Sequence, residues 1–231
     1  MFNMILDFLL PAECMLCESP LSGGQRYICA SCRAGLPRTG YHLRAENPMT
    51  LRVPPTVPYE RIAGFLFYTH ESPAALLIHD FKYRGISSLA RTMGRMMGEE
   101  LAASEFMEGV DWIMPVPLHW SKLMRRGYNQ SLELARGVSA ATGIAVSPDL
   151  KAIRPHATQT SKSTEERRRN TLGIFRLAHP ERYAGCKILI IDDVCTTGST
   201  ILSAAEAVYE GVKALGLTPP RISMLTLATT S

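Results

Sequence analysis

The chain has 231 residues, enough for one large domain or for a small module joined to a domain of ordinary size. Hydrophobic residues make up 46% of it and charged residues 20%, as in soluble globular proteins. The formal net charge of +4 is mildly basic. A polyanionic partner is compatible with this charge, but the charge alone does not predict one.

The first 14 residues, MFNMILDFLLPAEC, are apolar but short. They have no basic start and Asp7 interrupts them, so we expect neither a signal peptide nor a membrane span, which needs about 20 apolar residues. We predict a cytoplasmic protein whose amphipathic N-terminal segment packs on the chain's own body. The alternative is peripheral docking at the inner membrane through Phe2, Ile5, Phe8 and Leu9.

Four of the six cysteines form two CxxC turns, CMLC at 14–17 and CASC at 29–32. Each turn can direct two sulfurs at one metal ion, so the pair predicts a closed tetrahedral thiolate site for structural zinc. Its ligands would be Cys14, Cys17, Cys29 and Cys32. Disulfides, which require an oxidising compartment, and free thiols are the alternatives. We expect residues 1–46 to form a zinc module, because so short a segment builds no core without metal.

Residues 47–58, NPMTLRVPPTVP, contain four prolines and no apolar periodicity. This composition predicts a semi-rigid linker in the polyproline II conformation. The main domain would then span residues 59–231.

Strand-like and helix-like segments alternate through the rest of the chain. Apolar runs predict strands over residues 62–68 and 110–117, the second one ended by prolines. Ser72 and Pro73 predict the start of a helix and Gly85 its end. Two further helices are indicated by apolar residues at helical spacing: Leu89, Met93, Met96, Met97 and Leu101 in one, and Leu132, Ala135 and Val138 before Gly143 in the other.

The final part of the chain opens on KILII (187–191), a continuous apolar run typical of a strand buried on both faces. Apolar residues at helical spacing follow between Ile201 and Leu215, and RISMLTLAT (221–229) predicts a last strand. This alternation predicts an α/β fold in which a parallel sheet is flanked by helices.

The segment ILIIDDVCTTGST (188–200) places Asp192 and Asp193 between a buried strand and the start of a helix, at the sheet edge where ligands bind in such folds. Gly198 would let the backbone turn tightly, so that successive amide groups face one anion. The N-terminus of the following helix also favours an anion at this place. Hydroxyl donors come from Thr196, Thr197, Ser199 and Thr200. With phosphate in this loop, the carboxylates would accept hydrogen bonds from sugar hydroxyls, with Mg²⁺ close by. The alternative is a solvated aspartate turn followed by a helix cap.

This segment resembles the phosphoribosyl pyrophosphate (PRPP) motif of type I phosphoribosyltransferases. With CMLC…CASC, IHDFKYRG (78–85), MPVPLHWSKLMRRGYNQSLELAR (114–136) and TQTSKSTEERRRNTLGIF (158–175), the chain is similar to the ComF/GntX family over nearly its whole length. The resemblance implies a zinc module followed by a type I phosphoribosyltransferase fold. It also implies PRPP and Mg²⁺ as ligands and a link to DNA uptake in competent bacteria, beside a helicase.

By this resemblance, Asp192 and Asp193 are the ribose ligands, and residues 196–200 form the loop for the 5′-phosphate. Val194 and Cys195 complete the predicted phosphate and ribose site. Residues 118–126 take the place of the pyrophosphate loop, and residues 158–170 that of a flexible catalytic hood.

Basic residues outside the motif are predicted to hold pyrophosphate, because lysine and arginine match the charge of phosphate groups. The candidates on this side are Lys82, Arg84, Leu118, His119, Arg125 and Arg126. Arg125 and Arg126, with the two aspartates, are the predicted catalytic residues. Arg167, Arg168 and Arg169 would act from the hood, or else form a solvated helix face. A structural hydrogen bond is the alternative role for His119.

Two functions fit these residues. In the first, the protein is a phosphoribosyltransferase whose arginines stabilise the departing pyrophosphate. In the second, it is a non-catalytic PRPP- or nucleotide-sensing module that contacts single-stranded DNA or a DNA-uptake helicase. No segment after the last strand resembles a nucleobase-binding hood, which favours the second. A third hypothesis is that the zinc module's contact with a partner is the main role. Cys195, inside the loop, is a candidate redox-sensitive thiol.

Overall fold

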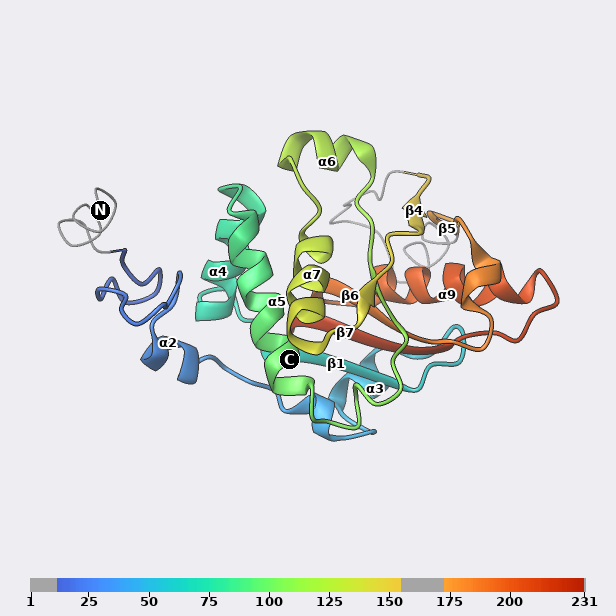
Figure 1. Cartoon of the computed structure of the whole chain (residues 1–231), viewed down its shortest axis with the longest axis horizontal. Helices are drawn as coiled ribbons and strands as arrows, with labels where there is room; N and C mark the ends of the chain where they lie inside the picture. Colours follow the sequence, from blue (N-terminus) through green and yellow to red (C-terminus); the bar gives the residue numbers. More distant parts are fainter. Residues whose placement is uncertain (1–11, 155–172, 231) are drawn as a thin grey trace.

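The computed structural model describes residues 12–154 and 173–230 (Figure 1). At its centre is a five-stranded sheet in the order β1-β7-β6-β2-β3, in which every neighbouring pair is parallel. The strands are β1 (Arg61–Phe67), β2 (Trp112–Pro115), β3 (Ala145–Val146), β6 (Lys187–Cys195) and β7 (Arg221–Thr229). The predicted parallel α/β fold is confirmed. Because the strands are parallel, their carboxyl ends meet at one edge of the sheet.

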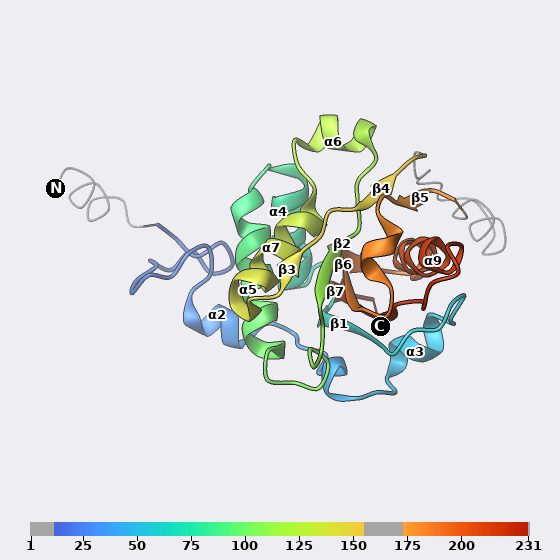
Figure 2. The ribbon, with the colours of Figure 1, turned by 45° about the vertical axis from the view of Figure 1, so that its right-hand side comes forward.

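Helices cover both faces of the sheet, with α4, α5 and α7 on one side and α9 on the other (Figure 2). Their bounds are Pro73–Tyr83 for α4, Ser87–Leu101 for α5, Gln130–Thr142 for α7 and Ser199–Lys213 for α9. The side chains of β6 divide between two cores. Leu189 and Ile191 join the core beneath α4, α5 and α7, whereas Ile188 and Ile190 join the core beneath α9. A strand buried on both faces explains the continuous apolar run.

The helix boundaries agree with the capping signals in the sequence. The hydroxyl of Ser72 accepts a hydrogen bond of 3.2 Å from the amide of Ala75, which starts α4. Gly143 ends α7 in the left-handed conformation, with φ of 76°. The end of α9 differs from the prediction: Leu215 is 53% exposed, because the helix has already ended at Lys213.

Several short elements were not predicted from the sequence. They are α2 (Ala30–Ala34), α3 (Pro48–Arg52), α6 (Trp120–Arg126), the 3₁₀ turns η1 (Tyr41–Leu43) and η2 (Pro180–Tyr183), the edge strand β3, and the antiparallel pair β4 (Leu150–Ala152) and β5 (Phe175–Leu177). None of the helices in the described parts of the chain is long and apolar enough to cross a membrane.

The prediction of a polyproline II linker over residues 47–58 is wrong for Pro48–Arg52, which form the helix α3. Asn47 forms a capping box with Thr50, which starts this helix. Met49 and Val53, four residues apart, lie on the same side and are fully buried in the core beneath α9. Two apolar residues are too few to reveal periodicity, which is why the sequence pattern missed the helix. The boundaries at residues 46 and 58 stay predictions.

The cysteine-rich segment packs on α5, at one end of the molecule (Figure 1). Cys14, Ile28 and Leu36 belong to the same buried cluster as the residues of α5. Ion pairs join Arg33 to Glu99 at 2.7 Å and Arg38 to Glu100 at 3.1 Å. The segment therefore shares a core and charged contacts with the α/β body.

Candidate functional site

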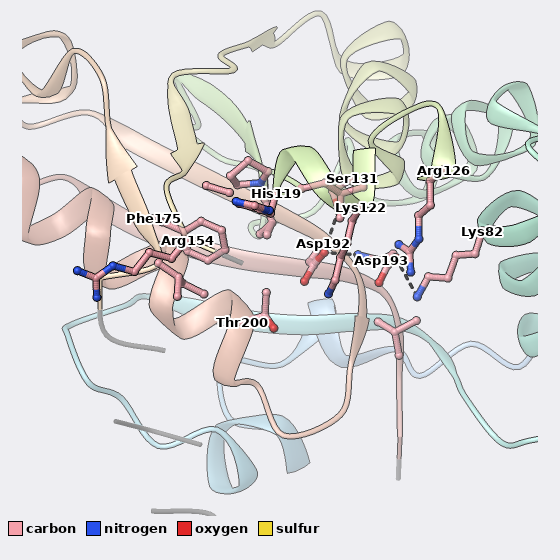
Figure 3. Close-up of a pocket in the computed structure, with 16 residues that line it drawn as sticks. Lys82, His119, Lys122, Arg126, Ser131, Arg154, Phe175, Asp192, Asp193 and Thr200 are labelled. Carbon is pink, nitrogen blue, oxygen red and sulfur yellow. Dashed lines mark hydrogen bonds and ion pairs between the residues drawn. The ribbon is translucent and has the colours of Figure 1, made fainter. Parts of the chain in front are cut away.

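A cavity of about 200 Å³ opens at the carboxyl edge of the sheet (Figure 3). Its walls come from the ends of β2 and β6, from α4, α6 and α7, and from the start of α9. The lining residues used below are Lys82, Leu118, His119, Lys122, Arg126, Ser131, Arg154, Phe175, Asp192, Asp193 and Thr200. The edge predicted to bind ligand is thus hollow, and both aspartates face the hollow.

Asp192 is 9% exposed and is held by two donors. The hydroxyl of Ser131 and the amide of Asp193 each donate a hydrogen bond of 2.9 Å to its Oδ1. Burial, followed by the neighbouring Asp193 charge, raises the pKa of Asp192 to about 7, against the opposing effects of these bonds and of Lys82. This carboxyl group therefore gains and loses its proton near neutral pH.

Asp193 has a different environment from its neighbour. Its Oδ2 lies 2.9 Å from Nζ of Lys82, which reaches the strand end from α4. Both side chains of this ion pair are largely buried, at 17% and 15% exposure. The repulsion between the adjacent carboxylates is thereby reduced, because one has a cation and the other a raised pKa.

Lys82, Lys122 and Arg126 give the cavity a cationic wall on the side of Asp193 (Figure 3). Burial, then the nearby charges of Arg126 and Arg125, lowers the pKa of Lys122. Arg126 donates to Oε1 of Gln130 at 3.0 Å, but its Nε is buried without a hydrogen-bond partner among the described residues. Such a wall is suited to an anion.

Two of the predicted pyrophosphate residues do not line this cavity. Arg84 is largely exposed and pairs with Asp80 at 3.2 Å, one helical turn away. Arg125 lies on a different side of α6 from Arg126, because adjacent helical residues point about 100° apart. Arg167, Arg168 and Arg169, and the predicted hood over residues 158–170, lie outside the described residues.

The predicted pyrophosphate loop, residues 118–126, is mostly a helix. Leu118 and His119 line the cavity, and α6 follows directly. Nδ1 of His119 lies 2.9 Å from the hydroxyl of Ser121, so His119 makes the structural hydrogen bond proposed as its alternative role. Gly127, in the left-handed conformation, ends this helix.

The strand β6 continues through both aspartates to Cys195, beyond its predicted end at residue 191, and the loop after it lines a second, smaller hollow of about 30 Å³. It is lined by Asp192, Val194, Cys195, Thr196, Thr197, Gly198, Ser199, Thr200, Ile201 and Thr226. Gly198 has φ of 79°, and the helix α9 begins at the next residue. Asp192, Val194 and Thr200 line both hollows, which are therefore neighbours. A group could extend from the loop into the larger cavity.

Among the lining residues that were not singled out from the sequence, four have a polar or aromatic side chain: Lys122, Ser131, Arg154 and Phe175. Lys122 lies inside the segment assigned to pyrophosphate, so charge alone could have indicated it. Ser131 lies in the first turn of α7, where its amide donates a hydrogen bond of 3.1 Å to the side chain of the capping residue Asn129. Arg154 lies just after β4 and Phe175 is the first residue of β5, and the sequence offered no signal for this pair of strands.

The four clustered cysteines have the geometry of a metal site. Their sulfur atoms all lie within 4.8 Å of one another, and the sulfurs of Cys17 and Cys29 are 3.7 Å apart. Tetrahedral zinc, with Zn–S bonds of about 2.3 Å, separates its sulfurs by about 3.8 Å, so the residues fit this ion. Burial opposes ionisation of Cys14, but backbone hydrogen bonds from Cys29, Leu16 and Cys17 lower its pKa to about 6. None of the six cysteines forms a disulfide.

Cys195 does not have the environment of a redox-sensitive thiol. It is 3% exposed, and burial raises its pKa to about 11. The reactive thiolate is therefore disfavoured.

Comparison with known proteins gives similarity at the level of sequence. No family model matches the chain. The chain is 32% identical to DNA utilization protein YhgH of Salmonella typhimurium over 213 residues, covering 85% of this chain and 90% of that protein. It is 33% identical to YhgH of Escherichia coli (strain K12) over 215 residues, with the same coverage. Competence protein F of Haemophilus influenzae is 31% identical over 137 residues, 56% of this chain and 58% of that protein.

Solved structures show a partial likeness. A glutamine PRPP amidotransferase from B. subtilis superposes with a TM-score of 0.39 at 17% identity, over 64% of this chain and 30% of that chain. An adenine phosphoribosyltransferase superposes with a TM-score of 0.38 at 15% identity, over 64% of this chain and 72% of that chain.

Proposed function

The chain belongs to the family of DNA utilization proteins that includes YhgH and is related to competence protein F, and we propose that its sheet-edge cavity binds a phosphoribosyl group. One observation carries the proposal. A buried carboxyl group and an ion-paired one stand directly between an amide-rich loop and a cationic wall. A sugar with phosphate groups at both ends would match this order of donors and acceptors.

The loop over residues 196–200 would take the 5′-phosphate. Its backbone turns at Gly198 into the N-terminus of α9, a 15-residue helix whose dipole favours an anion. Thr197 and Ser199, whose hydroxyls lie 2.9 Å apart, bring two further donors to the same turn.

Asp192 and Asp193 would accept hydrogen bonds from the ribose hydroxyls. Both hydrogen bonds to Asp192 use Oδ1, so we assign the sugar to Oδ2. Carboxylate oxygens are also the ligands that Mg²⁺ prefers, and these two fit that ion beside a diphosphate. When bound, Mg²⁺ would supply positive charge that neutralises the diphosphate.

The diphosphate of PRPP would lie against Lys82, Lys122 and Arg126. These three line the cavity, whereas Arg84 and Arg125 are outside it. They supply fixed positive charge where a leaving diphosphate gains negative charge, which is the requirement for catalysis by electrostatic stabilisation. In that reaction the bond from C1 of the ribose to the diphosphate breaks and a nucleophile forms the new bond to C1.

The volume of the cavity favours the alternative, a non-catalytic module that senses PRPP or a nucleotide. About 200 Å³ among the described residues is below the size of ordinary ligand pockets, about 300–1,000 Å³, and leaves little room for an acceptor beside PRPP. Incubation with PRPP, Mg²⁺ and candidate acceptors distinguishes the two: pyrophosphate release supports the transferase, and binding without release supports the module.

Calorimetry with PRPP and Mg²⁺ tests the site itself. The wild type should bind, and Asp192→Asn/Asp193→Asn should lose about tenfold or more in affinity, as expected for lost hydrogen bonds to charged groups. Equal affinity in both proteins would discard the ribose assignment.

Single-stranded DNA is a proposed partner, supported by exposed aromatic side chains near cations. Tyr83 is 66% and Trp120 68% exposed, and the Arg126 guanidinium lies 5.9 Å from the Tyr83 ring. Bases stack on such rings while cations neutralise the backbone. Fluorescence anisotropy with labelled oligonucleotide at two salt concentrations tests this, and no binding at low salt would end the idea. A helicase partner stays a prediction from the family resemblance.

A further inference from the structure

Arg52 joins the short helix α3 to the carboxyl ends of two central strands. It is the last residue of α3, and its guanidinium donates hydrogen bonds to the hydroxyl of Thr229 and to the carbonyl of Thr230, at the end of β7. The amide of Thr230 in turn donates to the carbonyl of Cys195, at the end of β6, at 3.2 Å. The side chain thus reaches the edge where the phosphate loop begins.

Cys195 connects Arg52 to that loop. Burial raises the pKa of its thiol, and the charge of Arg52 and the backbone amide of Gly198 oppose this effect, so both groups lie near the buried sulfur. Cys195 also lines the small hollow of the loop. A single side chain therefore separates the guanidinium from the turn whose amides would face the phosphate.

Val53, the residue after Arg52, lies directly beneath the same turn. A Cβ atom built on Gly198 would stand 2.5 Å from Cγ1 of Val53, far inside contact distance, and φ of 79° at Gly198 also disfavours a side chain. Val53 itself is fully buried. Val53, at the end of α3, therefore packs against the loop at Gly198.

The charge of Arg52 has no counterion within the described residues. Its hydrogen bonds go to a hydroxyl and a carbonyl, and its Nε is buried without a partner there. Burying a cation with an unsatisfied donor is unfavourable unless it serves another interaction. An anion seated in the loop would face this charge from the opposite side of the turn.

We infer that Arg52 is a positioning residue for the phosphate loop, and that with Val53 it holds the loop in the shape that accepts a phosphomonoester. This inference rests on the proposed function. It assigns a role in ligand binding to residues 47–58, which lie far from the loop in the sequence and outside its motif.

Two ligands separate positioning of the loop from general stability. Ribose 5-phosphate would use the loop, whereas Mg²⁺-pyrophosphate would use the cationic wall. By calorimetry, Arg52→Met should weaken ribose 5-phosphate binding about tenfold, the effect of one lost charge-assisted contact, and leave pyrophosphate binding unchanged. Leu51→Ala, a matched control on the same helix at a side chain that is 88% exposed, should change neither.

The outcomes are distinct. Unchanged ribose 5-phosphate affinity in Arg52→Met overturns the inference, and so does an equal loss for both ligands, which would indicate general destabilisation. A wild type that binds neither ligand overturns the proposed function, and this inference with it. If Arg52→Met fails to fold, Val53→Ala can be used instead, because it keeps Arg52 and removes the packing contact with Gly198. It is expected to show the same selective loss, and wild-type affinity for both ligands in that variant overturns the inference.

Discussion

At the scale of single residues, the adjacent aspartates Asp192 and Asp193 have different environments because their neighbours differ. Asp192 is buried beneath α7, where Ser131 and a backbone amide hold its Oδ1. Asp193, one position further, has Lys82 as its cation. Ser131 and Lys82 belong to α7 and α4, two helices on the same side of the sheet (Figure 2), so the difference comes from the individual neighbours of each carboxyl group. Two like charges at the end of a strand are thus tolerated through local chemistry.

The raised pKa of Asp192 predicts a pH dependence of stability. Between its ordinary pKa of 3.8 and about 7, the native state holds a proton that the unfolded state has lost. The contribution is fully present below the lower value and is lost as pH rises through the upper one. The free energy of unfolding of the wild type should therefore fall by up to about 4 kcal/mol from pH 4 to pH 8, relative to Asp192→Asn. Urea denaturation of both proteins across this range measures it, and parallel profiles would contradict the assignment.

Arg125 and Arg126 provide a matched pair for the cationic wall. Arg126 lines the cavity and Arg125 does not, although both are cations on the last turn of α6. Arg126→Ala should weaken PRPP binding about tenfold or more, because a contact to a charged group is lost. Arg125→Ala should stay close to the wild type. Equal losses in calorimetry would show that only long-range charge matters.

At the scale of elements, two short helices contribute residues at opposite ends of the candidate site. The helix α6 follows the cavity residues Leu118 and His119 and carries Lys122 and Arg126, while α3 lies under the phosphate loop. Both contain fewer than eight residues, so each depends on caps and tertiary contacts. Elements of this length have little periodicity, which is why they were not predicted.

The cap of α3 should matter for stability. The side chain of Asn47 accepts from the amide of Met49 and donates to the carbonyl of Ile62, both at 2.9 Å. Asn47→Ala removes the cap and the hydrogen bond to the Ile62 carbonyl, which together should cost about 1–3 kcal/mol. Leu51→Ala, at an exposed side chain, should cost less than about 0.5 kcal/mol. Chemical denaturation measures both, and equal costs would contradict the role of the cap.

At the scale of the whole molecule, the cysteine cluster and the α/β body are joined by a common core and by ion pairs to α5. The cysteine-rich segment is therefore part of the same folded body as the sheet. A metal bound to the native state alone stabilises everything that unfolds with it.

Metal removal should destabilise the whole chain in one transition. We expect about one zinc ion per chain, and chelation should lower the melting temperature by about 2–4 °C for each kcal/mol of binding lost. Cys17→Ser should have a lower melting temperature than the wild type, and chelator should not change it further. Cys186→Ser, outside the cluster, should behave as the wild type. A purified protein that lacks metal and is unaffected by chelator would remove the zinc proposal.

The sequence by itself determined the parallel α/β fold, the long helices and central strands, the grouping of the cysteines and the position of the aspartate motif. Each of these depends on local signals: apolar periodicity, caps such as Ser72, and residues close together in the chain. Only the folded chain shows which cations face the cavity, that Ser131 donates a hydrogen bond to Asp192, and that Val53, at the end of α3, lies against Gly198. The reason is physical: the site lies where parallel strands end, and its walls come from segments whose proximity is set by packing and leaves no local pattern in the sequence.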